Sequence, residues 1–296
     1  MVSRPAPAVL GRRAASMICR RVTRSSMSKI VLVTGASSEL GAATANALAG
    51  SGHTAYAGIS PAVVHPAGRL AEPSGHGARL RPISLDVADQ RSVSTAVGHI
   101  LAEAGRIDAV VHAIGPVPRG PLESFTPYQL AQIYDAHVLS TQRVNRSVLP
   151  QMRERQEGLL VWVVPANHDA EGAPYLALHS EAVTMIDHLA ASYARELTEF
   201  GVETTIVVPR FLVPETGPRV RTVHPDDAET VQAYEGRYPG LVHRVDSKLA
   251  EHALTGAEVA IAAQAIAAVV GSPKGTRPLR IAPGRPSAAS GQGAVW

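Results

Sequence analysis

Short runs rich in Val, Ile and Leu alternate with longer helical patterns along this chain from Lys29 onward. The expected strands are 30–34, 54–59, 79–85, 109–113, 159–164, 203–208 and 278–281. The helical patterns between them cover 42–50, 93–104, 127–155, 175–200 and 255–270. Nearly continuous apolar strands that alternate with helices indicate a parallel sheet covered on both faces. We therefore predict an α/β fold with one doubly wound parallel sheet, which binds its ligands beyond the carboxyl ends of the strands.

The length of the chain limits the number of domains. Its 296 residues are enough for one large α/β domain with a substantial core. We assign this single domain to 27–282 and regard 283–296 as a disordered tail. The longest irregular stretches, 60–78 and 211–250, are expected to be lids or substrate loops, because loops of this length are uncommon in compact domains.

Residues 1–26 form an Arg-rich extension with six arginines and no acidic residue. Three interpretations are open: a mitochondrial transit peptide, a disordered basic arm, or translation that starts upstream of a true initiator at Met27. We favour the last, because the whole chain is rich in Ala, Gly, Arg and Pro. Without the extension, 22 basic residues face 25 acidic ones. The sequence therefore indicates no basic face for nucleic acid.

The composition also disfavours several classes of protein and site. Cys19 is the single cysteine of the chain, which excludes an intramolecular disulfide and fits a reducing compartment such as the cytoplasm. No run of 18 apolar residues occurs in the sequence, so we expect no membrane-spanning segment. The sequence also lacks an HExxH motif and a Cys/His cluster, so we expect no metal site.

Four segments follow the expected strands in a characteristic order. A glycine-rich turn, TGASSELG at 34–41, follows the first strand, Asp86 and Val87 follow the third, and Gly115 follows the fourth. The segment 191–209, ASYARELTEFGVETTIVVP, has the pattern of a helix, a turn and the sixth strand. In these features the chain resembles the short-chain dehydrogenase/reductase family over residues 28–282. The resemblance implies a Rossmann-type fold and cofactor contacts from Gly35, Ser37, Gly41, Asp86, Val87 and Gly115.

Members of this family bind NAD or NADP and transfer a hydride, so the resemblance makes both dinucleotides possible cofactors. In the family's motif the middle glycine of the turn lies beside the pyrophosphate, and its place is taken here by Glu39. At ~5 Å and an effective dielectric of about 20, a carboxylate would repel a phosphate charge by roughly 3 kcal/mol. Alternatively, Glu39 points to solvent as the first-turn acid that helix dipoles favour. We expect the repulsion, and with it weakened dinucleotide binding.

The Asn-Ser-Tyr-Lys set that catalyses hydride transfer in the family is replaced at every position. In that order, the corresponding residues of this chain are His137, Ala166, His179 and Val183. In the family the tyrosine donates a proton to the substrate carbonyl, while the lysine lowers the pKa of the tyrosine and holds the nicotinamide ribose. Val183 can do neither, so the family's redox machinery is absent.

Three of the replacements bring polar groups toward the former catalytic pocket. Arg210 takes the place of the glycine in the family's Pro-Gly after the sixth strand, and it joins His137 and His179 as a candidate catalytic residue. Histidine ordinarily titrates near pH 6.5 and acts as an acid or a base without a lysine. Arginine binds carboxylates, phosphates and developing oxyanions. Residues 167–169 follow the fifth strand and could add donors at the rim.

Three functions are compatible with this pattern. The leading hypothesis is a non-redox acid–base catalyst of the cyclase, dehydratase, isomerase or lyase type, acting on a small organic molecule. The second is an NAD(P)H-dependent oxidoreductase in which His179 replaces the catalytic tyrosine. The third is a catalytically inactive partner of an active homologue. Because the family commonly assembles through two long helices, we expect a homo-oligomer or a hetero-oligomer with a homologue.

Overall fold

The structure is a computed structural model, and it describes residues 28–61, 70, 79–112, 115, 117–166, 174–209, 222–252 and 254–284. The predicted extension at 1–26 therefore lies outside the described residues. The same holds for the predicted tail beyond 284 and for parts of the stretches 60–78 and 211–250.

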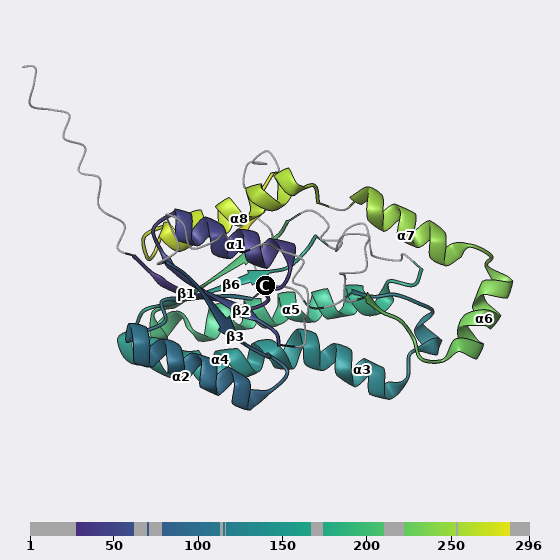
Figure 1. The fold of residues 1–296 in the computed structure, drawn as a ribbon, viewed down its shortest axis with the longest axis horizontal. Helices are drawn as coiled ribbons and strands as arrows, with labels where there is room; N and C mark the ends of the chain where they lie inside the picture. The colour runs from purple at the N-terminus through teal and green to yellow at the C-terminus, as the bar shows by residue number, and fades with distance from the viewer. Residues whose placement is uncertain are drawn as a thin grey trace, which may run out of the picture.

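A seven-stranded parallel sheet forms the centre of the molecule, with the strand order β3-β2-β1-β4-β6-β7-β9 (Figure 1). The strands are β1 (Ile30–Val33), β2 (Thr54–Ile59), β3 (Leu80–Ser84), β4 (Ala109–His112), β6 (Gly158–Val163), β7 (Val202–Val207) and β9 (Arg280–Ile281). The chain winds outward from β1 in one direction to β3 and then in the other to β9. This order confirms the prediction of a single-domain, doubly wound α/β fold of the Rossmann type.

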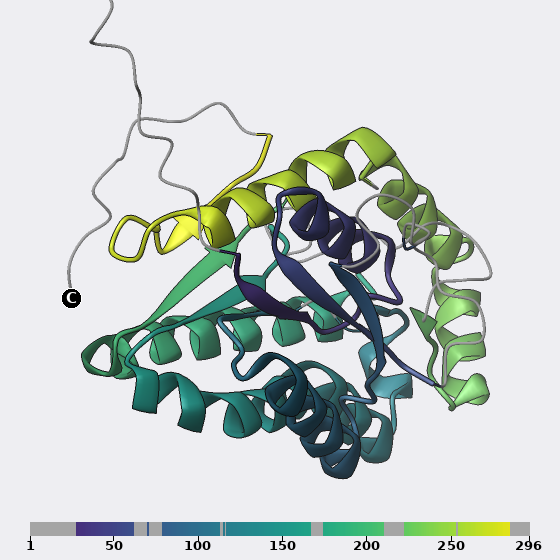
Figure 2. The same ribbon diagram turned by 60° about the vertical axis from the view of Figure 1, so that its left-hand side comes forward.

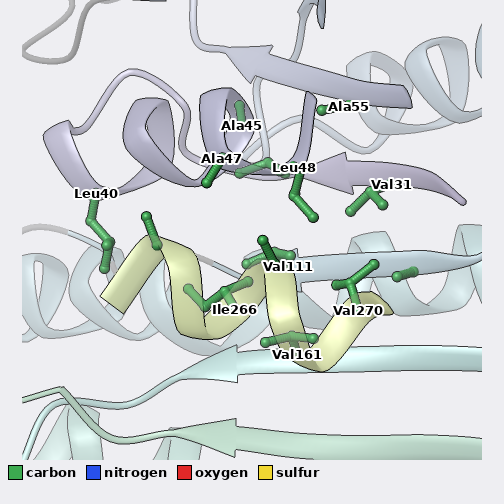
Figure 3. Close-up of a cluster of buried hydrophobic side chains, with 14 of the residues drawn as sticks. Val31, Leu40, Ala45, Ala47, Leu48, Ala55, Val111, Val161, Ile266 and Val270 are labelled. Carbon is green, nitrogen blue, oxygen red and sulfur yellow. The ribbon is translucent and has the colours of Figure 1, made fainter. Parts of the chain in front are cut away.

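Helices cover both faces of the sheet, as Figures 1 and 2 show. On one face, α1 (Glu39–Gly50) packs against α8 (Gly256–Gly271), and Leu48, Ile266 and Val270 fill the space above Val31 (Figure 3). The opposite face is covered by α2 (Gln90–Ala104), α4 (Ser140–Arg155) and α5 (Ala177–Glu196). Successive strand residues point to opposite faces of a sheet, so both apolar layers require strands without polar positions.

Two segments differ from the prediction. The expected helix 127–155 is divided into α3 (Pro127–Tyr134) and α4 by a π-helical turn, Asp135–Leu139. The stretch 211–250 was expected to be irregular, and this is wrong for its described part. That part contains α6 (Ala228–Arg237) and α7 (Leu241–His252). Helix α6 has no buried residue, so the apolar periodicity that predicts helices is absent there.

The new helices lie near the carboxyl ends of the strands (Figure 1). They stand beside a small second sheet, in which β5 (Val117–Pro118) pairs in parallel with β8 (Thr222–Val223). None of the helices in the described part of the chain has the length and hydrophobicity needed to cross a lipid bilayer.

Candidate active site

The glycine-rich turn between β1 and α1 keeps a close-packed backbone. Gly35 has a φ of 87°, in the left-handed region that glycine adopts most easily. Ser38 caps α1, because its hydroxyl accepts a hydrogen bond from the backbone nitrogen of Gly41 at 3.0 Å. A Cβ atom on Gly41 would lie 2.1 Å from the carbonyl oxygen of Gly35, so only glycine fits there. The turn therefore retains the shape that lets a backbone approach a phosphate.

Glu39 is the first residue of α1 and is half-buried. A helix N-terminus carries a partial positive charge, which stabilises an acidic side chain and equally attracts a phosphate. Glu39 thus belongs to the end of the helix at which a pyrophosphate would bind. Its position agrees with the predicted repulsion and also with the alternative of a stabilising first-turn acid, so the predicted loss of affinity stays a prediction.

The other predicted cofactor residues at this end form local contacts. The hydroxyl of Ser37 accepts a hydrogen bond from the backbone nitrogen of Ser60 at 3.2 Å and so joins the turn to the end of β2. The carboxylate of Asp86 accepts one from the backbone nitrogen of Ala88 at 3.0 Å. Val87 is half-buried and packs against the apolar cluster under α2 and α4. All of them lie where β1, β2 and β3 end, as predicted.

His137 and His179 are brought together and buried, each with a relative exposure of 1%. His137 is the middle residue of the π-helical turn, and its ring lies against Gly115, where a Cβ atom would come within 2.9 Å of the ring. A side chain at Gly115 would therefore meet this imidazole, whereas the predicted cofactor contact of Gly115 stays a prediction. His179 lies in the first turn of α5, near enough to His137 for the two rings to interact electrostatically.

Burial, together with His137, lowers the pKa of His179 to about 4. Removal from water disfavours the charged imidazolium, and a neighbouring imidazole adds to this effect. His179 is therefore neutral at pH 7. The expectation that it titrates near pH 6.5 is wrong, because a sequence pattern does not show how deeply a ring is buried.

Of the other residues predicted for the catalytic pocket, the structure describes Val183 and Ala166. Val183 is 2% exposed and belongs to the apolar core beneath α5. Ala166 offers only its backbone nitrogen, which donates to the carbonyl oxygen of Pro209 at 3.0 Å. Arg210 and the residues 167–169 lie outside the described part of the chain.

The sequence analysis did not identify a further buried histidine, His112, or its contact with Asn145. His112, the last residue of β4, shares a hydrogen bond of 2.9 Å between its Nε2 and the Oδ1 of Asn145 on α4. Its ring centre lies 4.6 Å from that of Trp162. Burial lowers the pKa of His112 to about 4, although the hydrogen bond to Asn145 opposes this shift. Asn145 lies about two helical turns after His137, which places the two residues on the same side of the helix. This spacing was the signal in the sequence that pointed to Asn145.

The glycine-rich turn and the positions of Ala166 and Val183 differ in what they offer a nicotinamide dinucleotide. The turn at 34–41 keeps the backbone shape for a pyrophosphate. At the other end, Val183 supplies no ammonium group and Ala166 no hydroxyl, the two groups that the family resemblance requires there. The ring of His137 also closes against Gly115. The predicted doubt about a nicotinamide cofactor therefore stays a prediction.

Comparisons with known proteins agree with this fold. The family model described as short chain dehydrogenase matches residues 29–222. A 3-ketodihydrosphingosine reductase of Bacteroides thetaiotaomicron is 27% identical over 181 residues, which are 61% of this chain and 63% of that protein. The chain thus spans less than two thirds of this relative's length.

Solved structures give the same result. A short-chain dehydrogenase from Streptomyces avermitilis superposes with a TM-score of 0.64 at 26% identity, over 86% of this chain and 87% of that one. A metagenomic short-chain oxidoreductase in complex with NADP superposes with a TM-score of 0.61 at 18% identity, over 88% and 99% of the two chains, and shows the fold alone. The fold, the glycine-rich turn and the matching family model lead to one conclusion: this chain belongs to the short-chain dehydrogenase family.

Proposed function

We propose that this chain is a non-redox acid–base catalyst, of the cyclase, dehydratase, isomerase or lyase type, that acts on a small organic molecule. The observation that carries the proposal is the buried pair of His137 and His179 at two former catalytic positions. Proton transfer needs only these rings, whereas hydride transfer in this family also needs the lysine position, which is Val183 here.

A neutral imidazole suits this chemistry, because one ring nitrogen accepts a proton while the other donates a hydrogen bond. With a pKa of about 4, His179 is a base of carboxylate strength that stays unprotonated at neutral pH. A buried site also strengthens each electrostatic interaction with developing charge. The pair can therefore move a proton next to a carbonyl group and stabilise the resulting oxygen.

A second candidate, an NAD(P)H-dependent oxidoreductase, is supported by the close contact between Gly41 and Gly35 in the turn at 34–41. The similarity to a short-chain oxidoreductase solved with NADP points in the same direction. In this case His179 would replace the proton-donating tyrosine. Its lowered pKa leaves little imidazolium to donate a proton at pH 7, which is why we place this candidate second.

The test follows hydrogen–deuterium exchange next to the carbonyl of cyclopentanone and 1-indanone by NMR, without cofactor. We expect His179→Phe to slow exchange by ~10²–10⁴-fold. Phenylalanine fills similar space but has no ring nitrogen that could accept or donate a proton. His188→Phe, at an exposed position of the same helix, is the matched control. The wild-type rate should fall only as the pH approaches about 4, where His179 becomes protonated.

Two outcomes contradict the proposal. Consumption of NADPH or NADH with either ketone, together with tight dinucleotide binding, would establish the oxidoreductase. A dinucleotide at 100 times its Kd should stabilise the protein by ~2.7 kcal/mol, which a melting curve detects. If neither exchange nor reduction occurs and a homologue binds the chain, the inactive-partner hypothesis replaces ours; size-exclusion chromatography then distinguishes a homo-oligomer from a hetero-oligomer.

A further inference from the structure

An ion pair spans the π-helical turn that carries His137. The carboxylate of Asp135, the first residue of the turn, accepts hydrogen bonds from both terminal nitrogens of Arg143 on α4, one of them at 3.2 Å. Both side chains are partly buried, with 21% of Arg143 and 29% of Asp135 exposed, so water and salt screen this pair less than a surface pair. Two parallel hydrogen bonds between a guanidinium and a carboxylate fix the geometry of the pair. Arg143 is therefore tied to the start of the turn.

The sequence separation of this pair fits a π-helical turn better than a continuous α-helix. Asp135 and Arg143 are 8 positions apart, and in a continuous helix of about 3.6 residues per turn their side chains would point roughly 80° away from each other. A π-helical turn takes up one extra residue, and the bond from the Ser140 nitrogen to the Asp135 carbonyl oxygen has this longer spacing. The pair is then placed like residues about seven apart, which share one face of a helix. The ion pair and the turn therefore stabilise each other.

Two hydroxyl groups at the start of α4 also bond to the turn. The Ser140 hydroxyl donates to the carbonyl oxygen of Ala136 at 2.7 Å, and the Thr141 hydroxyl donates to that of Val138 at 2.8 Å. Side-chain bonds of this kind satisfy helix carbonyl groups and often bend the helix. Both bonds lie within one helical segment, so they support the shape of the turn but do not fix it against the rest of the fold.

Arg143 joins the turn to a segment that is distant along the chain. Its Nη1 donates a hydrogen bond to the carbonyl oxygen of Val87, at 3.3 Å, in the loop after β3. The same guanidinium thus binds the turn through Asp135 and the sheet end through Val87. The ring of His137, in the middle of the turn, is buried against Gly115. Because the ring is packed this closely, its position follows that of the turn.

We propose that Arg143 is a positioning residue, which holds the π-helical turn in place and thereby keeps the ring of His137 against Gly115. The proposal rests on the proposed function for its catalytic meaning, because an acid–base role makes the position of His137 matter for activity. The anchoring of the turn by Arg143 can be measured without any activity. Arg146 is exposed on the same helix and provides a matched control for the loss of an arginine.

The experiment records the α-proton signals of Gly115 by NMR on the full chain, because the ring current of the adjacent His137 shifts them. His137→Leu, which has no ring, gives the unshifted position. Arg143→Gln should move the Gly115 signals most of the way toward that position, because the turn loses its anchor. Arg143→Lys keeps the charge without the planar fork and should give an intermediate shift. Arg146→Gln should leave the signals as they are in the wild type.

The same variants are tested for hydrogen–deuterium exchange next to the carbonyl of 1-indanone. Arg143→Gln should slow exchange by ~10-fold or more, because a displacement of about 1 Å can reduce a rate by up to ~10²-fold. Asp135→Asn should have the same effect, and the double variant should be no slower than either single one, since both changes remove one ion pair. If Arg143→Gln does not fold, Asp135→Asn provides the same test.

The proposal is overturned if folded Arg143→Gln or folded Asp135→Asn keeps the Gly115 signals of the wild type, or if Arg146→Gln moves them as far. A lower melting temperature with unchanged Gly115 signals would show a merely structural ion pair and would overturn it too. If the wild-type chain catalyses no exchange, the proposed function fails, and the Gly115 signals alone then confirm or overturn the role of Arg143.

Discussion

The glycine-rich turn at 34–41 and the histidine pair lie in the two regions where the family resemblance predicts the ends of a cofactor site, and they differ in how the sequence departs from the family's pattern. The turn keeps its backbone, with Gly41 against Gly35, and changes one side chain, Glu39. At the other end, the π-helical turn carries His137 and α5 carries His179, and the family resemblance implies that these side chains replace catalytic ones.

This difference follows from how each end works. A phosphate-binding turn acts through backbone nitrogens and a helix N-terminus, so the fold of the chain preserves it. A catalytic set acts through side-chain groups, which substitution removes without disturbing the helices. Under the proposed function, the chain has kept the backbone shape of a cofactor site without the redox chemistry.

The largest expected effect concerns acid stability at the histidine end. His112 and His179 have a pKa of about 4 in the folded protein and ~6.5 when unfolded. Their contribution to the free energy of unfolding is complete above pH 6.5 and is lost as the pH falls toward 4, by roughly 3 kcal/mol for each. Urea denaturation at several pH values measures this loss.

Carboxylates also titrate between pH 6.5 and 4. A comparison with variants therefore shows whether His179 causes part of the loss of stability. His179→Phe should lose less stability between pH 6.5 and 4 than the wild type, while His188→Phe should lose as much. Equal losses in all three proteins would show that His179 is not buried as the structure has it.

The next effect concerns the turn. Gly41→Ala should destabilise the protein by about 1–3 kcal/mol, because the new methyl group meets the backbone of Gly35 and the turn must shift. Gly98→Ala is the control, since Gly98 lies within α2 with no atom near its Cβ position; this change should stabilise by about 0.5–1 kcal/mol. Similar melting temperatures for the two variants would contradict the close contact.

The smallest effect concerns the charge in the turn. Glu39→Gly and Glu39→Gln should each tighten binding of NADP by about tenfold, or ~1.4 kcal/mol, and more at low salt. The glutamine variant separates charge from size. Fluorescence titration measures both affinities, and unchanged values would show that the carboxylate points away from the phosphates.

Much of the fold could be predicted from local patterns. The run 54–59 coincides with β2, and the capping residues Ser38 and Thr255 begin helices near the predicted positions. Strands and helix starts of this kind depend on residues close together in the sequence, so the sequence predicts them. Helix α6 was missed because none of its residues is buried. Helix α7 was missed although Leu241 and Val245 recur at helical spacing.

For the candidate site, the sequence analysis named residues but not their surroundings. The resemblance placed His137 and His179 at the carboxyl ends of the strands, yet the π-helical turn, the contact with Gly115 and the hydrogen bond from Arg143 to Val87 were not foreseen. The contact with Gly115 and this hydrogen bond join segments that are distant along the chain, so no local pattern encodes them. The π-helical turn is local, but no residue pattern in the sequence analysis indicated it.

The amino-acid order alone was sufficient for the doubly wound sheet and for most of the helices that cover it. Only the packed structure decided that His179 is neutral at pH 7 and that Arg143 reaches the loop after β3. The reason is physical. Secondary structure follows from periodicity and capping over a few residues, whereas a pKa and a contact between distant segments depend on how the whole fold packs and excludes water.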